Sequence, residues 1–205
     1  MIISLDQMTG TVRLMKKKHR IAVAWAQDSN TINSIYRSVL EGFTEALLIG
    51  QRAKITELCR MNGLEPAHFN IINSEDEAAS AETAVQLVKS GDADILMKGL
   101  VGTDILMKAI MDKEKGLMKT DAVLSYVGAI EIPEYHKLLF VTDPAVIPYP
   151  TLSQKIAMTG YAVEMARRFG IDNPKVALIG ASEKASRHFL YRSEEHTSEL
   201  QSPNT

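Results

Sequence analysis

The sequence predicts an α/β protein with a mostly parallel sheet flanked by helices. Short apolar runs alternate along the chain with segments of helical period, which is the pattern of a parallel sheet covered by helices. Residues 21–26 are apolar throughout, as expected of a strand buried on both faces. Capping residues and glycines separate the segments, so approximate element boundaries follow from the chain itself.

Further strands are expected in several apolar runs that follow the first one. These runs are 46–49, 69–72, 95–97, 122–127, 138–141 and 176–179. Helices are expected between them, over residues 29–41, 53–61, 74–90, 103–115 and 151–169. Two of the helices start with the capping-box pattern, Ser74 with Glu77 and Thr151 with Gln154.

Three prolines suggest a domain boundary. Pro144, Pro148 and Pro150 stand between an expected strand and an expected helix. We therefore expect a first α/β domain over residues 1–147, which lacks its C-terminal return, and the start of a second, incomplete α/β domain over 148–191. Residues 192–205 have no sustained apolar period and resemble a translated sequencing adapter, so we expect a non-native tail there.

Composition excludes several functional classes. The chain has 205 residues, 45% of them hydrophobic, and a net charge of −2, which argues against a nucleic-acid partner. No apolar run approaches the roughly 20 residues that span a bilayer, and no signal peptide is apparent, so no membrane association is expected. The single cysteine, Cys59, fits a reducing compartment and a cytoplasmic location. The five histidines show no metal-ligand spacing, so no metal site is expected.

The candidate site begins at the loop after the fourth expected strand. Lys98 and Gly99 leave that strand, and a helix is expected from Thr103. Ligands of open α/β sheets bind beyond the carboxyl ends of strands, and helix N-termini bind anions. A lysine, a glycine and free helix N–H groups would suit a phosphate, but a solvent-facing lysine and a turn glycine explain the same residues equally well.

Three polar residues in or after later strands also allow two interpretations. Ser125 lies within the expected strand 122–127 and is either a satisfied core hydroxyl or a hydroxyl aimed at a ligand. Thr142 and Asp143 follow the next expected strand. Asp143 could accept a hydrogen bond from a ligand or cap the turn that precedes Pro144.

Several of these segments together resemble the phosphate acetyl/butyryl transferase family, most closely its phosphate butyryltransferase branch. The segments are 95–99 with Thr103, 112–117, 124–127, 139–145 and 150–157, in order and with compatible spacing. Tyr126 stands where the family more typically has histidine, which leaves the role of that side chain open.

The resemblance implies a two-domain fold of the isocitrate/isopropylmalate dehydrogenase type with the site between the domains. It implies exchange of a short-chain acyl group between coenzyme A and phosphate, with no cofactor apart from coenzyme A as a substrate. Lys98, Gly99 and Thr103 would line the phosphate side, and Ser125, Thr142 and Asp143 would contribute from neighbouring strand ends. The catalytic residues stay unknown, because the family's Ser-Arg-acidic motif has no counterpart here.

The partners expected from the resemblance are acyl-CoA or CoA and phosphate or acyl phosphate, and the full-length parent is expected to be a homo-oligomer. The fragment itself is expected to be inactive. Two alternatives stay open at this point: another phosphate acyltransferase of the same fold, and a non-catalytic metabolite-binding domain. The sequence does not give the acyl chain length.

Overall fold

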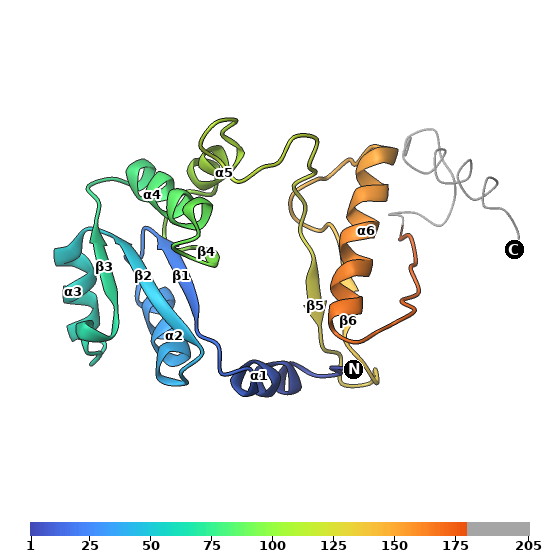
Figure 1. Cartoon of the computed structure of the whole chain (residues 1–205), viewed down its shortest axis with the longest axis horizontal. Coiled ribbons are helices and arrows are strands. Elements are labelled where there is room, and N and C mark those ends of the chain that lie inside the picture. The colour runs from blue at the N-terminus through green and yellow to red at the C-terminus, as the bar shows by residue number, and fades with distance from the viewer. Residues whose placement is uncertain (180–205) are drawn as a thin grey trace, which may run out of the picture. The chain divides into compact units, whose positions relative to one another are not determined.

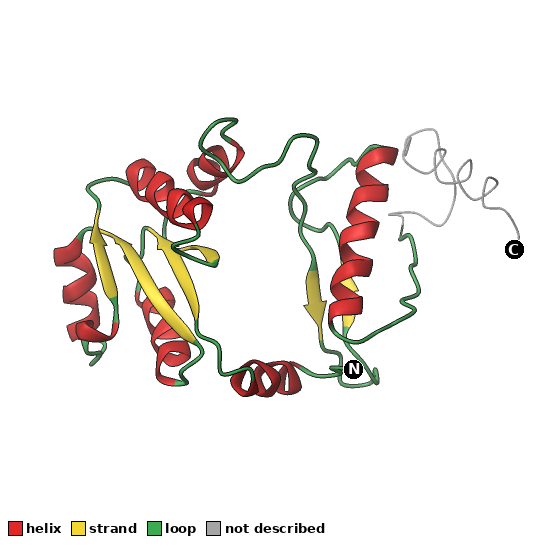
Figure 2. Ribbon diagram, in the orientation of Figure 1, coloured by secondary structure: helices red, strands yellow, loops and turns green. Residues whose placement is uncertain are grey.

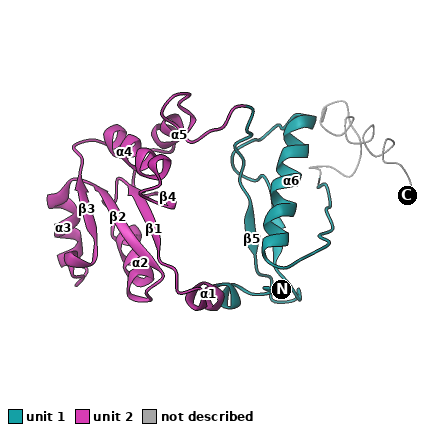
Figure 3. Cartoon of the chain, in the orientation of Figure 1, with its two compact units in different colours: residues 1–8, 121–205 teal, residues 9–120 magenta. Residues whose placement is uncertain are grey.

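The computed structural model describes residues 1–179, which form two compact units (Figure 3). Unit 1 comprises Met1–Met8 and the chain from Asp121 onward, and unit 2 comprises Thr9–Thr120. The division therefore falls at residue 120, whereas the sequence suggested a domain end at 147. The expected tail, 192–205, and residues 180–191 before it lie outside the described residues.

Unit 2 is built on a sheet of four parallel strands in the order β3-β2-β1-β4 (Figure 1). The strands are β1 (His19–Ala24), β2 (Thr44–Gly50), β3 (Asn70–Asn73) and β4 (Ile95–Lys98). Ile21 of β1 is in register with Ala46 on one side and with Ile95 on the other. The predicted α/β fold with a parallel sheet is confirmed.

Helices cover both faces of this sheet. They are α2 (Ser29–Leu40), α3 (Arg52–Met61), α4 (Glu77–Ser90) and α5 (Thr103–Met111), with a short 3₁₀ turn, η1, at Pro66–His68. Alternate residues of β1 point to opposite faces: Val23 packs into the core with α2 and α3, whereas Ala22 and Ala24 pack with α4 and α5. Both faces are thus buried, which explains the continuous apolar run of the first strand.

Helix boundaries in unit 2 follow local capping chemistry, and two of them differ from the boundaries predicted from the sequence. Asp76 caps the start of helix α4, because its side chain accepts from the Ala79 N–H at 2.8 Å, so the capping box expected at Ser74 is wrong. Helix α5 ends at Met111 rather than at residue 115, because the Asp112 carboxylate accepts from two following N–H groups and forms a turn.

Unit 1 contains a two-stranded antiparallel sheet and one long helix. The elements are β5 (Gly128–Ile130), β6 (Leu139–Val141) and α6 (Leu152–Arg168). The capping box of Thr151 and Gln154 is confirmed at the start of α6. The strand expected at 122–127 is wrong: the segment between α5 and β5 is loop (Figure 2), and the strand begins at Gly128. The strand expected at 176–179 is also absent, because no neighbouring strand pairs with these residues among the described ones.

Helix α1 (Leu5–Leu14) was not expected from the sequence. None of its residues is buried. Its first turn is instead held by side chains: the Gln7 N–H donates to Ser4 Oγ at 3.1 Å, and the Gln7 side chain accepts from the Ile3 N–H at 3.0 Å. The spacing of Ser4 and Gln7 was the available signal.

Candidate functional site

The Lys98 loop extends the sheet of unit 2 beyond the end of β4. The Gly99 N–H donates to the Ala24 carbonyl at 3.0 Å, and the Leu100 N–H donates to the Trp25 carbonyl at 2.9 Å. A Cβ at position 99 would lie 2.7 Å from both carbonyl oxygens, which is too close for any side chain. Glycine is therefore required at position 99 by the packing of two strand ends, whether or not a ligand approaches.

Lys98 is exposed at the end of β4, and Thr103 is exposed at the start of α5. The Lys98 Nζ lies 3.4 Å from the Gly99 carbonyl oxygen, and no further partner is recorded for it in the described part of the chain. The first N–H groups of α5 have no acceptor within the helix, and no side chain in the described part of the protein caps the helix. A cation beside such N–H groups can bind an anion.

The Glu77 carboxylate contacts the residue that precedes α5. The Gly102 N–H donates to Glu77 Oε2 at 2.8 Å, across from the start of α4. Glu77 therefore occupies the Gly102 N–H, which a ligand could otherwise have bound. The N–H groups from Thr103 onward stay available to a ligand. Sequence reasoning assigned Glu77 to a capping box and missed this contact, which joins two helix N-termini.

Ser125, Thr142 and Asp143 lie at one end of the hairpin in unit 1. The register of β5 and β6 pairs Gly128 with Val141, so extending the ladder by two residues would place Tyr126 opposite Asp143. The Tyr126 N–H donates to Asp143 Oδ2 at 3.1 Å in place of a main-chain acceptor. Pro144 follows without an N–H, which ends the ladder. Ser125 is therefore in a loop, and its expected position within a strand is wrong.

The Asp143 carboxylate accepts hydrogen bonds from main-chain N–H groups. Its Oδ1 accepts from the N–H groups of Ala145 and Val146, both at 2.8 Å. Burial alone would raise the pKa of Asp143, but the main-chain N–H groups that it accepts from, with Val146 and Ala145 first and Tyr126 next, lower it below the usual value. Of the two roles left open by the sequence, the structure shows the turn-capping one.

Two hydroxyls in the segments that this carboxylate joins have no hydrogen-bond partner within residues 1–179. Ser125 Oγ and Thr142 Oγ1 are both buried and unpaired, and Gln27 Nε2 in unit 2 is the third such side-chain atom among the described residues. A buried polar group without a partner costs about 1–3 kcal/mol, so such groups are rare and call for an explanation. Gln27 follows β1, and its amide lies 3.1 Å from where a Cβ at Gly50 would stand. The strand-end rule could have identified it.

A cavity of about 820 Å³ adjoins the Asp143 turn within unit 1. Its walls come from β6, the loop that follows β6, helix α6 and residues 174–179. Most of the lining is aliphatic, including Val163 and Ala166 of α6, whereas Leu152 and Ile156 of the same helix are exposed. Thr142, Asp143 and Lys155 contribute polar groups to the cavity.

The six expected site residues thus form two groups of three. Lys98, Gly99 and Thr103 lie in unit 2, and Ser125, Thr142 and Asp143 lie in unit 1. No cluster of histidine, cysteine and carboxylate side chains among residues 1–179 is arranged to hold a metal ion. None of the helices described is both long and apolar enough to cross a membrane.

The sequence pattern of the phosphate acetyl/butaryl transferase family matches residues 78–196, a segment that contains both groups. The chain belongs to this family. Phosphate butyryltransferase of Clostridium acetobutylicum is 36% identical over 183 residues, which are 89% of this chain and 60% of that protein. Phosphate acetyltransferase of Thermotoga maritima is 36% identical over 167 residues, which are 82% of this chain and 56% of that protein.

Solved structures show the same fold. A branched-chain phosphotransacylase from Enterococcus faecalis superposes with a TM-score of 0.74 at 24% identity, over 90% of this chain and 65% of that one. A phosphotransacetylase from Streptococcus pyogenes gives 0.72 at 18% identity, over 97% and 70%. The family resemblance drawn from the sequence is confirmed, and the chain spans about 60% of the length of the curated relatives that it matches.

Proposed function

We propose that this chain is part of a phosphate acyltransferase, which exchanges a short-chain acyl group between coenzyme A and phosphate. The observation that carries the proposal is the family match over residues 78–196, which includes the loop at Lys98 and the turn at Asp143. Because the chain spans about 60% of its relatives, the activity is proposed for an enzyme of their length. The 205-residue chain alone is proposed to be inactive.

The reaction is a direct acyl transfer. A phosphate oxygen attacks the thioester carbonyl carbon, the carbon–sulfur bond breaks, and the thiolate of coenzyme A takes up a proton. Such a reaction needs a cation for the phosphate and donors for the carbonyl oxyanion. We assign the phosphate to Lys98 with the N–H groups at Thr103, since these residues offer a positive charge and donors without an acceptor inside the helix. We assign no catalytic residue.

The exposed lysine and helix end also fit a cytoplasmic enzyme that works on dissolved phosphate and acyl-CoA. A homo-oligomeric parent, with no nucleic acid or membrane partner, is part of the same proposal. A non-catalytic metabolite-binding domain is the alternative outcome of the following test.

The test is release of coenzyme A from butyryl-CoA in the presence of phosphate. We would join the chain after residue 179 to the region of the Clostridium acetobutylicum protein that lies beyond the corresponding position. The joined protein should release coenzyme A in a phosphate-dependent way. Phosphate binding without release would favour the binding-only alternative, and neither activity nor binding in a folded protein would contradict the proposed function.

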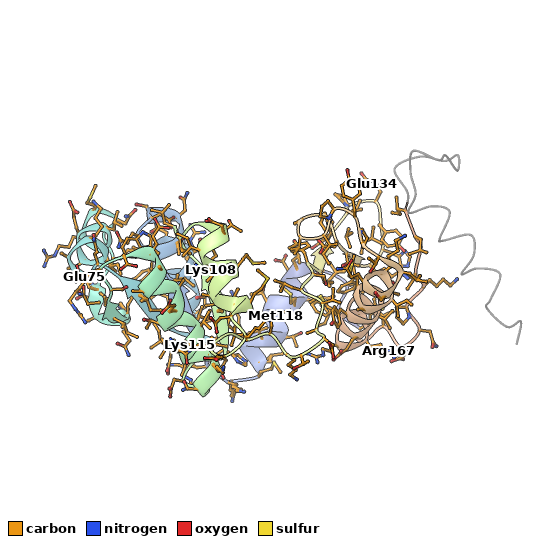
Figure 4. The ribbon with its side chains drawn as sticks, turned by 90° about the horizontal axis from the view of Figure 1, so that it is seen from above. Glu75, Lys108, Lys115, Met118, Glu134 and Arg167 are labelled. Carbon is orange, nitrogen blue, oxygen red and sulfur yellow. The ribbon has the colours of Figure 1, made fainter. Side chains whose placement is uncertain are left out.

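Lys98→Ala tests the phosphate assignment in the joined protein. Loss of a charge-assisted contact worth about 1.5–3 kcal/mol should raise the KM for phosphate roughly 10- to 100-fold. Lys108→Ala is the matched control, because Lys108 is an exposed lysine in the last turn of α5, labelled in Figure 4. Equal KM values for the two variants would remove Lys98 from the site.

A further inference from the structure

Trp25, which follows β1, has a backbone conformation that is unusual for a bulky residue. Its φ is 54°, in the left-handed region that favours glycine. Two other residues apart from glycine have a positive φ among residues 1–179, Lys16 and Asp121, and both are exposed outside helices and strands. Trp25 is instead half-buried at the carboxyl edge of the sheet, where ligands of parallel α/β sheets bind. Its conformation costs free energy, so neighbouring contacts have to hold it.

Three parts of Trp25 are each held by a contact within unit 2. Its N–H donates to Ser80 Oγ of α4 at 2.7 Å, and its side chain packs against the core cluster formed with α4 and α5. Its carbonyl accepts from the Leu100 N–H at 2.9 Å, in the loop that follows Lys98. Strained residues that are held from several sides are found where a site has to keep one geometry.

The left-handed conformation of Trp25 aims two successive carbonyls at the same loop. In an extended strand, successive carbonyls point to opposite sides and serve different neighbours. Ala24 and Trp25 depart from this rule: the Ala24 carbonyl accepts from the Gly99 N–H at 3.0 Å, and the Trp25 carbonyl accepts from the Leu100 N–H. Helical dihedral angles of either hand place successive carbonyls on one side. The φ of Trp25 is therefore what allows both bonds to form.

The two carbonyls fix the beginning of the loop between Lys98 and Thr103. The residues that donate to them directly follow Lys98. Val101 comes next and is fully buried, and the Gly102 N–H is bonded to Glu77. With each intervening residue held, the lysine at the end of β4 and the first N–H groups of α5 keep one relative position.

We propose that Trp25 is a positioning residue for phosphate, and that its left-handed backbone holds the loop from Lys98 to Thr103 in the form that binds the anion. Trp25 acts through the Leu100 N–H and does not itself touch the phosphate. This inference rests on the proposed function, from which the assignment of phosphate to Lys98 and Thr103 comes. It goes further by making the φ of Trp25, and not its ring, the property that sets the affinity for phosphate.

Trp25→Gly and Trp25→Val separate the φ requirement from the loss of the indole ring. Both variants lose the ring, but glycine adopts a positive φ readily, whereas β-branched valine strongly disfavours it. In the joined protein, the KM for phosphate should be about 3- to 10-fold higher for the valine variant than for the glycine variant. The KM for butyryl-CoA should be the same for both. Equal KM values for phosphate, or an equal difference for both substrates, would overturn the inference.

Lys16→Gly and Lys16→Val are the matched control pair. Lys16 has a φ of 50° but precedes β1, so it lies at the opposite end of that strand from Trp25. The two Lys16 variants should differ in stability and have the same KM for phosphate. A difference in KM as large as that between the Trp25 variants would contradict the inference, because strain anywhere in unit 2 would then have the same effect.

Amide exchange in the 205-residue chain follows the loop directly. The Leu100 N–H should exchange faster in the valine variant than in the glycine variant, and inorganic phosphate should shift the amide signals of residues 103 and 104 at a lower concentration in the glycine variant. Thiol reactivity of Cys59, which is fully buried in unit 2, checks that both variants are folded. If the valine variant is unfolded, Trp25→Ala takes its place, since alanine also disfavours a positive φ. Equal Leu100 exchange in two folded variants would contradict the proposed positioning.

The two proposals can fail separately. Turnover by the joined protein with equal phosphate KM values in the two Trp25 variants would overturn this inference and leave the proposed function intact. A joined protein without turnover would remove the proposed function. The inference would still stand if the phosphate response of the 205-residue chain differed between the two variants.

Discussion

The two units differ in how much apolar side chain each one buries. Among the described residues, all buried apolar side chains lie in unit 2 except those of Leu138, Met158 and Ala166. Unit 2 has helices on both faces of its sheet, whereas unit 1 has two short strands, one long helix and a cavity of about 820 Å³. A two-stranded sheet with one helix encloses little core. Secondary structure alone therefore does not stabilise a unit. Because unit 2 buries more apolar side chains, it should be the more stable of the two.

Two side chains report on unit 2 by itself. Trp25, the single tryptophan of the chain, follows β1, and Cys59, the single cysteine, is fully buried on α3. Burial raises the pKa of the Cys59 thiol, so it should react with thiol reagents only when unit 2 opens. Tryptophan fluorescence and thiol reactivity therefore follow unit 2, and amide exchange can follow unit 1.

The largest expected effect comes from truncating the core of unit 2. Leu48→Ala should destabilise unit 2 by about 2–5 kcal/mol, because Leu48 is fully buried and closely packed. Leu138→Ala in unit 1 should cost less, about 1.5–3 kcal/mol, because Leu138 already borders the cavity and loses mainly its transfer free energy. Urea unfolding followed by the two sets of probes measures both. Equal costs would mean that unit 1 is packed as closely as unit 2.

Next in size is the substitution of Gly99. Gly99→Ala should destabilise unit 2 by about 1–3 kcal/mol, because the new Cβ would meet two carbonyl oxygens at 2.7 Å. Gly10→Ala is the control: it lies within α1 with open space around it and should stabilise by about 0.5–1 kcal/mol. Thermal unfolding monitored by Trp25 compares them, and a neutral Gly99→Ala would show that the strand ends can separate.

Removing one helix cap from each unit should lower the stability of each unit by a smaller and similar amount. Asp76→Ala and Thr151→Ala each delete a side chain that accepts from a first-turn N–H, at a cost of about 1 kcal/mol. If unit 1 is the less stable unit, the same loss should open α6 at a lower urea concentration than α4. Amide exchange along the two helices provides the measurement, and a reversed order would contradict the ranking of the units.

The smallest expected effect is a dependence on pH in unit 1. The pKa of Asp143 is lowered in the folded state, so its contribution to stability is present above the usual value of 3.8 and is lost as pH falls through the lowered pKa. Asp143→Asn should remove that part of the acid sensitivity of unit 1. In unit 2 the pKa values of Asp94 and Asp112 are lowered too, and their acid response should be unchanged by the substitution.

The sheet of unit 2 was predictable, since each strand is an apolar run that ends at a glycine or a polar residue. The run 122–127 has the same character but forms no strand, because the Asp143 side chain bonds to the Tyr126 N–H and Pro144 follows. That competition comes from residues about 17 positions away in the sequence. Local pattern cannot show it.

The candidate site was predictable at the level of strand ends. The strand-end and helix N-terminus rules identified Lys98, Gly99, Thr103, Thr142 and Asp143, and Ser125 stood out as a polar residue in an apolar run. The family resemblance added only the roles that these residues would have. It could not show that Asp143 caps a turn or that Glu77 reaches Gly102, because both depend on side-chain directions after folding. Unpaired hydroxyls also become visible only once all neighbours are placed.

Ser80 of α4 is a fully buried polar residue with a consequence for how relatives should vary. Its hydroxyl accepts from the Trp25 N–H at 2.7 Å and donates to the Ile49 carbonyl at 3.2 Å, where β1 and β2 leave the sheet. Alanine would leave the Trp25 N–H without its acceptor, whereas the Ile49 carbonyl would still accept from the Ala26 N–H at 2.9 Å. Position 80 should therefore vary little among related sequences. An invariant serine close to a ligand-binding edge would look like a substrate contact, although folding alone accounts for it.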